Sequence, residues 1–160
     1  MTRPATSSEF GAASYRQGAW ERLEEARVLL NAQRFAGCIY LAGRGVEAML
    51  RALVWKADLE YQRGAKSLET GHDLRALLTL VRNLGLVHDG AAGQRFTATI
   101  QRVSRLWSNN LRFAPRQFIE TRWCYLGEIH GRRTLKQAAR EYWETCAATI
   151  RECEVLWPRA

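Results

Sequence analysis

Three charged residues have the types and the spacing to form a charged site on one helix. Arg44, Glu47 and Arg51 lie three and then four residues apart in the segment 34–59. Side chains at these spacings share one helix face, so the Glu47 carboxylate can reach both guanidinium groups. Two interpretations stay open. The three residues form a salt-bridged seam that fixes helix packing, or they line a cleft that binds a ligand.

A second polar group lies between a tryptophan and a phenylalanine. It consists of Asn109, Asn110 and Arg112. Amide and guanidinium groups can hydrogen-bond to a nucleobase or a phosphate, and aromatic rings can stack on a base. Arg105 precedes these residues at near-helical spacing and joins the predicted binding set. Ordinary capping and turn chemistry is the alternative explanation for the two asparagines.

The net charge of the chain favours an anionic partner. It is +8, and 21 of the 24 basic residues are arginines. Arginine makes bidentate contacts with phosphate and carboxylate groups and stacks on bases, so nucleic acid is the first partner to consider. A genome-wide preference for arginine codons is the alternative explanation.

Cysteine and histidine usage predicts neither a metal site nor a cofactor. The four cysteines form no CxxC pair, and the three histidines are scattered. Buried, reduced cysteines in a cytoplasmic protein are the favoured interpretation. The first residues lack the apolar core of a secretory signal, and no segment approaches the length of a membrane span.

The hydrophobic pattern predicts an all-α fold, an antiparallel bundle of four to five helices. Residues 1–14 are predicted to be a flexible segment, and residues 15–157 a single domain. Loops are expected at 61–69 and 86–93, and residues 116–130 are ambiguous between a short helix and an ordered loop. The predicted helices cover residues 15–33, 34–59, 70–84, 94–111 and 132–157.

The helix predicted over residues 34–59 should lie at the centre of the bundle. Two neighbouring rows of apolar residues run along it, so it should be buried on more than one side. The joint at residues 31–33 is so short that the preceding helix must return antiparallel to it. In the third helix, Thr70 is predicted to cap the chain with Asp73 three residues on. We expect His72 to hydrogen-bond to the backbone there.

The chain resembles HEPN-type domains over roughly residues 15–157. The resemblance lies in the segments YLAGRGVEAMLRAL, GHDLRALL and RLWSNNLRFAP. It implies an all-α bundle that is usually a homodimer. Many such domains are metal-independent ribonucleases of toxin–antitoxin, defence or RNA-processing systems, often encoded beside a small nucleotidyltransferase partner. Others have lost catalysis and act as binding modules.

The nuclease motif of HEPN-type domains is an arginine followed, after four to six residues, by a histidine on a late helix. The resemblance implies that the histidine acts as general acid or base while the arginine stabilises the charge on the phosphate. No histidine follows the late-helix arginines of this chain at that distance. Arg82 and His88 match the spacing but fall across a predicted helix end and loop. With 21 arginines in the chain, a chance match is the alternative.

The missing histidine favours a non-catalytic HEPN-like module. Such a module would dimerise and bind RNA, a nucleotide or a partner protein through an arginine-lined cleft. The alternative is a metal-independent ribonuclease with a divergent site, for example Arg105, Asn109 and Arg112 with a histidine from elsewhere. A third possibility is a structural partner of a nucleotidyltransferase. The predicted binding residues are Arg44, Glu47, Arg51, Arg105, Asn109, Asn110 and Arg112.

Overall fold

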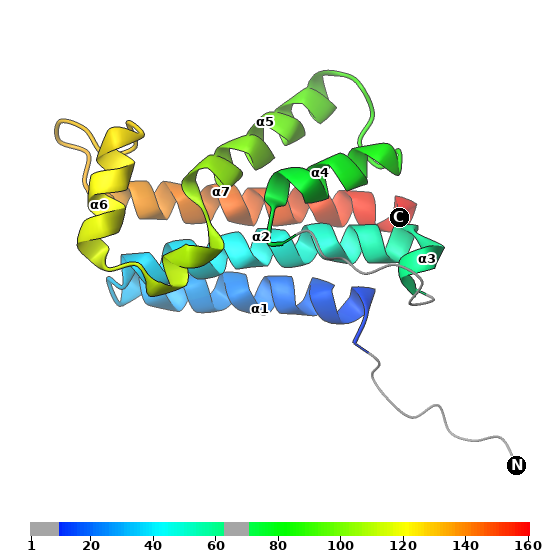
Figure 1. Cartoon of the computed structure of the whole chain (residues 1–160), viewed down its shortest axis with the longest axis horizontal. Helices are drawn as coiled ribbons and strands as arrows, with labels where there is room; N and C mark the ends of the chain where they lie inside the picture. The colour runs from blue at the N-terminus through cyan, green and yellow to red at the C-terminus, as the bar shows by residue number, and fades with distance from the viewer. Residues whose placement is uncertain (1–9, 63–70) are drawn as a thin grey trace, which may run out of the picture.

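Every regular element in the described part of the chain is helical. The computed structural model describes residues 10–62 and 71–160. Figure 1 shows three long helices, α1, α2 and α7, side by side, with α4 and α5 above them and α6 across one end. The α-helices are α1 (Ala12–Asn31), α2 (Phe35–Ala57), α3 (Leu59–Gln62), α4 (Leu74–Asn83), α5 (Ala91–Leu106), α6 (Arg116–Tyr125) and α7 (Leu135–Leu156). Two 3₁₀-helices, η1 (Asn109–Phe113) and η2 (Trp157–Arg159), complete the set.

Helix α2 lies at the centre of the core, as its two apolar rows predict. It packs against α1, α4 and α7, and apolar residues on several of its sides are fully buried. Gly45 allows this close approach, because a Cβ there would lie 3.0 Å from the Ala19 carbonyl oxygen on α1 and 3.2 Å from Ile150 on α7. The all-helical class is confirmed. The predicted count of four to five helices is wrong, since the described residues form seven α-helices.

Helix α4 begins later than its sequence pattern predicts. Asp73 is its N-cap, and its side chain accepts hydrogen bonds from the backbone N–H of Arg75 at 2.8 Å and of Ala76 at 3.3 Å. The proposed cap, Thr70, lies outside the described residues. The helix ends as predicted before Gly85, whose φ of +70° closes the turn that glycine permits most readily.

Helix α5 ends at Leu106, five residues before the predicted end. Trp107 adopts an extended conformation, with ψ at 145°, and its buried indole donates a hydrogen bond to the Tyr40 carbonyl oxygen at 3.0 Å. Burial of this ring against α2 outweighs the continuing helical pattern. Residues Asn109–Phe113 then form η1 instead of a last α-helical turn.

The ambiguous segment 116–130 contains a helix followed by an irregular connection. Helix α6 buries Ile119 and Trp123 against the core. Beyond it, the buried Glu128 carboxylate accepts hydrogen bonds from Arg102 at 3.1 Å and Arg105 at 3.0 Å. An ion-pair network of Glu128, Glu141, Arg102, Arg105 and Arg133 thereby joins the connection to α5 and α7.

Three of the four cysteines are buried, as predicted, and one is not. Burial raises the pKa of the Cys38 thiol to about 12 and raises the pKa values of Cys146 and Cys153 well above their ordinary value. Cys124 is exposed on α6, although its sequence neighbours are large and aromatic, because only one side of α6 contacts the core. No helix in the described ranges is long and apolar enough to cross a membrane.

The first and last long helices are joined by one carboxylate. The Glu154 side chain accepts two hydrogen bonds from Arg16 Nε, at 2.9 and 3.0 Å, one from Arg16 Nη2 at 2.6 Å and one from the Trp20 indole at 2.8 Å. These bonds hold α1 against α7. The hydrogen bonds from Arg16 lower the pKa of Glu154 most, and the Trp20 bond and the Arg16 charge add to this effect.

We expect Glu154→Gln to lower the free energy of unfolding by about 1 kcal/mol at pH 7, since a partly exposed charged hydrogen bond is lost. Because the folded pKa lies below the ordinary value of 4.5, this stabilisation is complete above pH 4.5. It disappears as the pH falls through the lower, folded value. Urea unfolding of both proteins between pH 7 and pH 3 measures the difference. A difference in unfolding free energy that is the same at pH 3 as at pH 7 would contradict the lowered pKa of Glu154.

Candidate binding site

The predicted seam on α2 is a buried charged cluster. The Glu47 side chain is 2% exposed and accepts hydrogen bonds from Arg44 Nη1 at 2.5 Å and from Arg51 Nε at 2.8 Å. Arg51 is largely buried and Arg44 is about one-third exposed. A buried carboxylate requires such partners, because its desolvation costs several kcal/mol otherwise. The cluster therefore explains how α2 tolerates an acid inside the core.

His72 is the fourth member of this cluster. Its Nδ1 atom lies 2.8 Å from Glu47 Oε1 and 2.7 Å from Arg44 Nη1. Nδ1 either donates to the carboxylate or accepts from the guanidinium, according to the tautomer, and either bond ties the residues before α4 to α2. Within the described residues, His72 thus bonds to side chains of α2 and not to the backbone as predicted. Its φ of +64° places it in the left-handed region that histidine seldom adopts.

A hollow of about 480 Å³ lies beside this cluster, between the start of α4 and η1. We call it the asparagine hollow. The side chains of Ser108, Asn109 and Asn110 make no hydrogen bond to any part of the chain that the structure describes, although they are consecutive and all line the hollow. The other lining residues are Gly71, His72, Asp73, Leu74, Arg75, Ser104 and Trp107.

The wall of the asparagine hollow is fixed to the core through Trp107. This side chain is 3% exposed, and its ring stacks on Tyr40 with centroids 6.4 Å apart. Gly43 makes the contact possible, because a Cβ at that position would lie 2.2 Å from the indole. On the opposite wall, Arg75 Nε donates to Ser104 Oγ at 3.2 Å. The hollow thus has a rigid base and a cationic side chain at its edge.

The predicted binding residues do not share a single arginine-lined cleft. Glu47 holds Arg44 and Arg51, and Arg44 also lines a separate groove between α1 and α2. Arg105 pairs with Glu128 in the ion-pair network that joins the segment after α6 to α5 and α7. Only the two asparagines line the asparagine hollow, and Arg112 lies on the next turn of η1 with its guanidinium carbon 4.5 Å from the Phe113 ring centroid.

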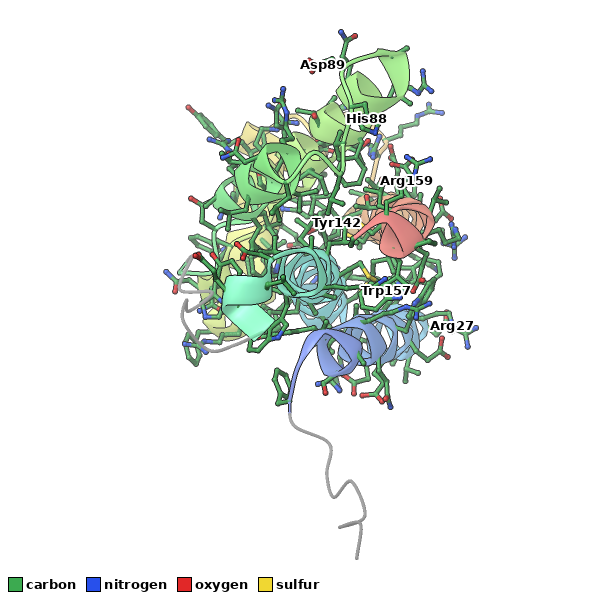
Figure 2. The ribbon with its side chains drawn as sticks, turned by 90° about the vertical axis from the view of Figure 1, so that its right-hand side faces the viewer. Arg27, His88, Asp89, Tyr142, Trp157 and Arg159 are labelled. Carbon is green, nitrogen blue, oxygen red and sulfur yellow. The ribbon has the colours of Figure 1, made fainter. Side chains whose placement is uncertain are left out.

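The structure does bring Arg82 and His88 to one hollow. They line a space of about 180 Å³ at the connection between α4 and α5, together with Asp89, which lies 3.8 Å from Arg82. His88 is exposed there. Figure 2 looks onto this end of the molecule, where His88 and Asp89 lie above Arg159, the last residue of η2. An imidazole, a guanidinium and a carboxylate therefore line the same hollow.

Sequence reasoning missed the residues that complete these sites. Long-range contacts bring His72 to Glu47 and Arg75 to Ser104, and no local pattern indicates either pair. The exposed aromatic residues of α6, Phe118 and Tyr125, were detectable. They lie seven residues apart, on a different side of the helix from Ile119 and Trp123. No cluster of three or more metal-ligating side chains occurs in the described ranges.

Comparison with protein-family models, with curated proteins and with solved structures found no match. The resemblance to HEPN-type domains therefore depends on the sequence segments that suggested it. The homodimer and the nucleotidyltransferase partner that it implies stay predictions.

Proposed function

We propose that this chain is a non-catalytic RNA-binding module that holds a nucleobase in the asparagine hollow. The observation that carries the proposal is that Ser108 and Asn110 line one hollow with side chains that bond to no described residue, beside Asn109, whose buried Oδ1 atom also lacks a partner. Folded proteins normally bond their polar groups internally or to solvent. An asparagine amide presents a donor and an acceptor side by side, the pattern that pairs with an adenine edge.

The charges around the hollow suit the phosphates on either side of a bound base. Arg75 lies at its edge, and its Ser104 contact leaves further N–H donors available. The carboxylate of Asp73 already caps α4, which reduces its repulsion of an anion. The net charge of +8 adds a long-range attraction for RNA. In a HEPN-like protein that lacks the nuclease histidine, this role fits a toxin–antitoxin or defence system.

The test is RNA binding by the wild-type protein and by Asn110→Ala. Fluorescence anisotropy with a labelled single-stranded RNA of mixed sequence gives the dissociation constant. Asn110→Ala should weaken binding about tenfold, since one good base contact is worth about 1–3 kcal/mol. Asn83→Ala is the matched control, because Asn83 is also exposed, at the end of α4, but lies outside the asparagine hollow. Equal affinities of Asn110→Ala and wild type for the RNA would show that no base binds in the asparagine hollow.

A metal-independent ribonuclease is the second candidate function. The specific observation in its favour is that Arg82, His88 and Asp89 line one hollow. Incubation of an RNA pool with purified protein in EDTA distinguishes the two functions. The leading proposal requires that the RNA stay intact. If the wild-type protein cleaves the RNA and His88→Ala does not, the protein is a ribonuclease and His88 is its general base.

A further inference from the structure

Helix α6 turns an unusual set of side chains toward solvent. Ile119 and Trp123 anchor its inner side and are fully buried. Phe118, Arg122 and Tyr125 follow at spacings of four and three along a different side, so they form one stripe. Phe118 is 52% exposed and Tyr125 is 89% exposed. Exposed aromatic residues grouped on one surface mark interaction sites more often than isolated ones do.

The element before α6 in the chain, η1, forms one wall of the asparagine hollow and has a further exposed aromatic residue, five positions before Phe118. Phe113 is 76% exposed, and the guanidinium of Arg112 lies over its ring. Arg122 Nη2 donates to the Arg105 carbonyl oxygen at 3.1 Å, which fixes the stripe against the end of α5. Figure 1 shows η1 leading directly into α6 at the end of the bundle. We call Phe113, Phe118 and Tyr125, with Arg112 and Arg122, the aromatic stripe.

The charge of this segment indicates what covers the stripe. Residues 112–125 contain three arginines and a single acid, Glu120, which accepts a hydrogen bond from Arg116 at 2.8 Å. A second copy of the same surface would bring like charges together, which disfavours a symmetric dimer here. An anionic partner with flat apolar groups would match both the arginines and the exposed aromatic rings. Unpaired nucleobases joined by phosphates have this chemistry, and every base can stack on an aromatic ring.

We propose that the aromatic stripe is a stacking surface for single-stranded RNA, with bases on Phe113, Phe118 and Tyr125 and phosphates on Arg112 and Arg122. The inference rests on the proposed function and specifies its ligand, because duplex RNA keeps its bases stacked inside the helix. The asparagine hollow holds one base, and the stripe binds the adjoining strand with little dependence on sequence.

The first test compares two double variants of α6. Phe118→Ala with Tyr125→Ala removes both rings, whereas Gln117→Ala with Thr121→Ala changes two exposed residues on another side of the same helix. Alanine at exposed helix positions favours folding. We expect the ring variant to lose about tenfold in affinity for single-stranded RNA per ring, and the control to bind as wild type. Equal affinities of the two variants for RNA would show that the aromatic stripe does not bind it.

The second test separates stacking from phosphate contact. Loss of the rings should leave the slope of log affinity against log salt unchanged, whereas Arg112→Gln should reduce it by about 0.7. A single-stranded 20-mer should bind at least tenfold more tightly than the corresponding duplex at equal salt. Equal or tighter binding of the duplex would show that the surface contacts phosphates without stacking on bases, which would overturn the proposal.

The outcomes distinguish this inference from the proposed function. If wild type binds RNA, Asn110→Ala weakens it and the ring variant does not, the hollow stands and the stripe fails. If wild type binds no RNA, both fail. Light scattering at the assay concentration detects the remaining alternative. A wild-type dimer that the ring variant converts to a monomer would assign the stripe to a second copy of the chain.

Discussion

Glu47→Gln is expected to lower the free energy of unfolding by about 2–4 kcal/mol. Removal of one partner of a buried ion pair typically costs about 3–5 kcal/mol, and the partial exposure of Arg44 reduces that figure. The amide offers one acceptor oxygen where the carboxylate offers two, so it cannot accept from Arg44, Arg51 and His72 together. Urea unfolding followed by circular dichroism measures the change.

The control for this variant is Glu21→Gln, which makes the same change in charge on the exposed side of α1. We expect it to alter stability by less than about 0.5 kcal/mol. Glu47→Gln should also weaken RNA binding, because His72 lines the asparagine hollow and loses its tie to α2. If Glu47→Gln proves as stable as Glu21→Gln, the cluster does not hold these helices together.

Gly43→Ala should be destabilising by about 3 kcal/mol, although alanine is the better helix former. The new Cβ would lie 2.2 Å from Cδ1 of Trp107 and 2.5 Å from its Nε1. The indole is buried and hydrogen-bonded to the Tyr40 carbonyl oxygen, so it cannot move without breaking that bond. Overpacking of this kind costs about 1–3 kcal/mol, to which the lost hydrogen bond adds about 1 kcal/mol.

Thermal unfolding of Gly43→Ala and Gly18→Ala provides the comparison. A Cβ at Gly18 on α1 would meet no atom within 4 Å, so that variant should gain about 0.5–1 kcal/mol from helix propensity. In a 160-residue protein, each kcal/mol shifts the melting temperature by about 2–4 °C. The combination of Gly43→Ala with Trp107→Ala should be less destabilised than the sum of the single changes, because alanine removes the ring that the new Cβ meets. Additive losses of stability would show that Gly43→Ala does not act through a clash with the Trp107 side chain.

The helices and the charged seam were predictable because their determinants are local. The apolar rows of α2 and the spacing of Arg44, Glu47 and Arg51 are properties of one helix. The hollow was not predictable in the same way. Its form depends on Trp107 leaving the helical path to contact α2, and on His72 reaching a carboxylate 25 residues earlier in the chain. Local propensity contains no information on either tertiary contact.

The placement of α7 has a consequence for the order in which the protein is made. This helix covers α2 and also contacts α1 through Glu154 and through the Trp143 indole, which donates to the Leu23 carbonyl oxygen. Ribosomes complete α2 at Ala57, 78 residues before α7 begins at Leu135. During that interval the most apolar helix of the chain lacks one of its covering partners. The nascent chain must therefore bind a chaperone or another apolar surface, or remain at risk of aggregation, until α7 emerges.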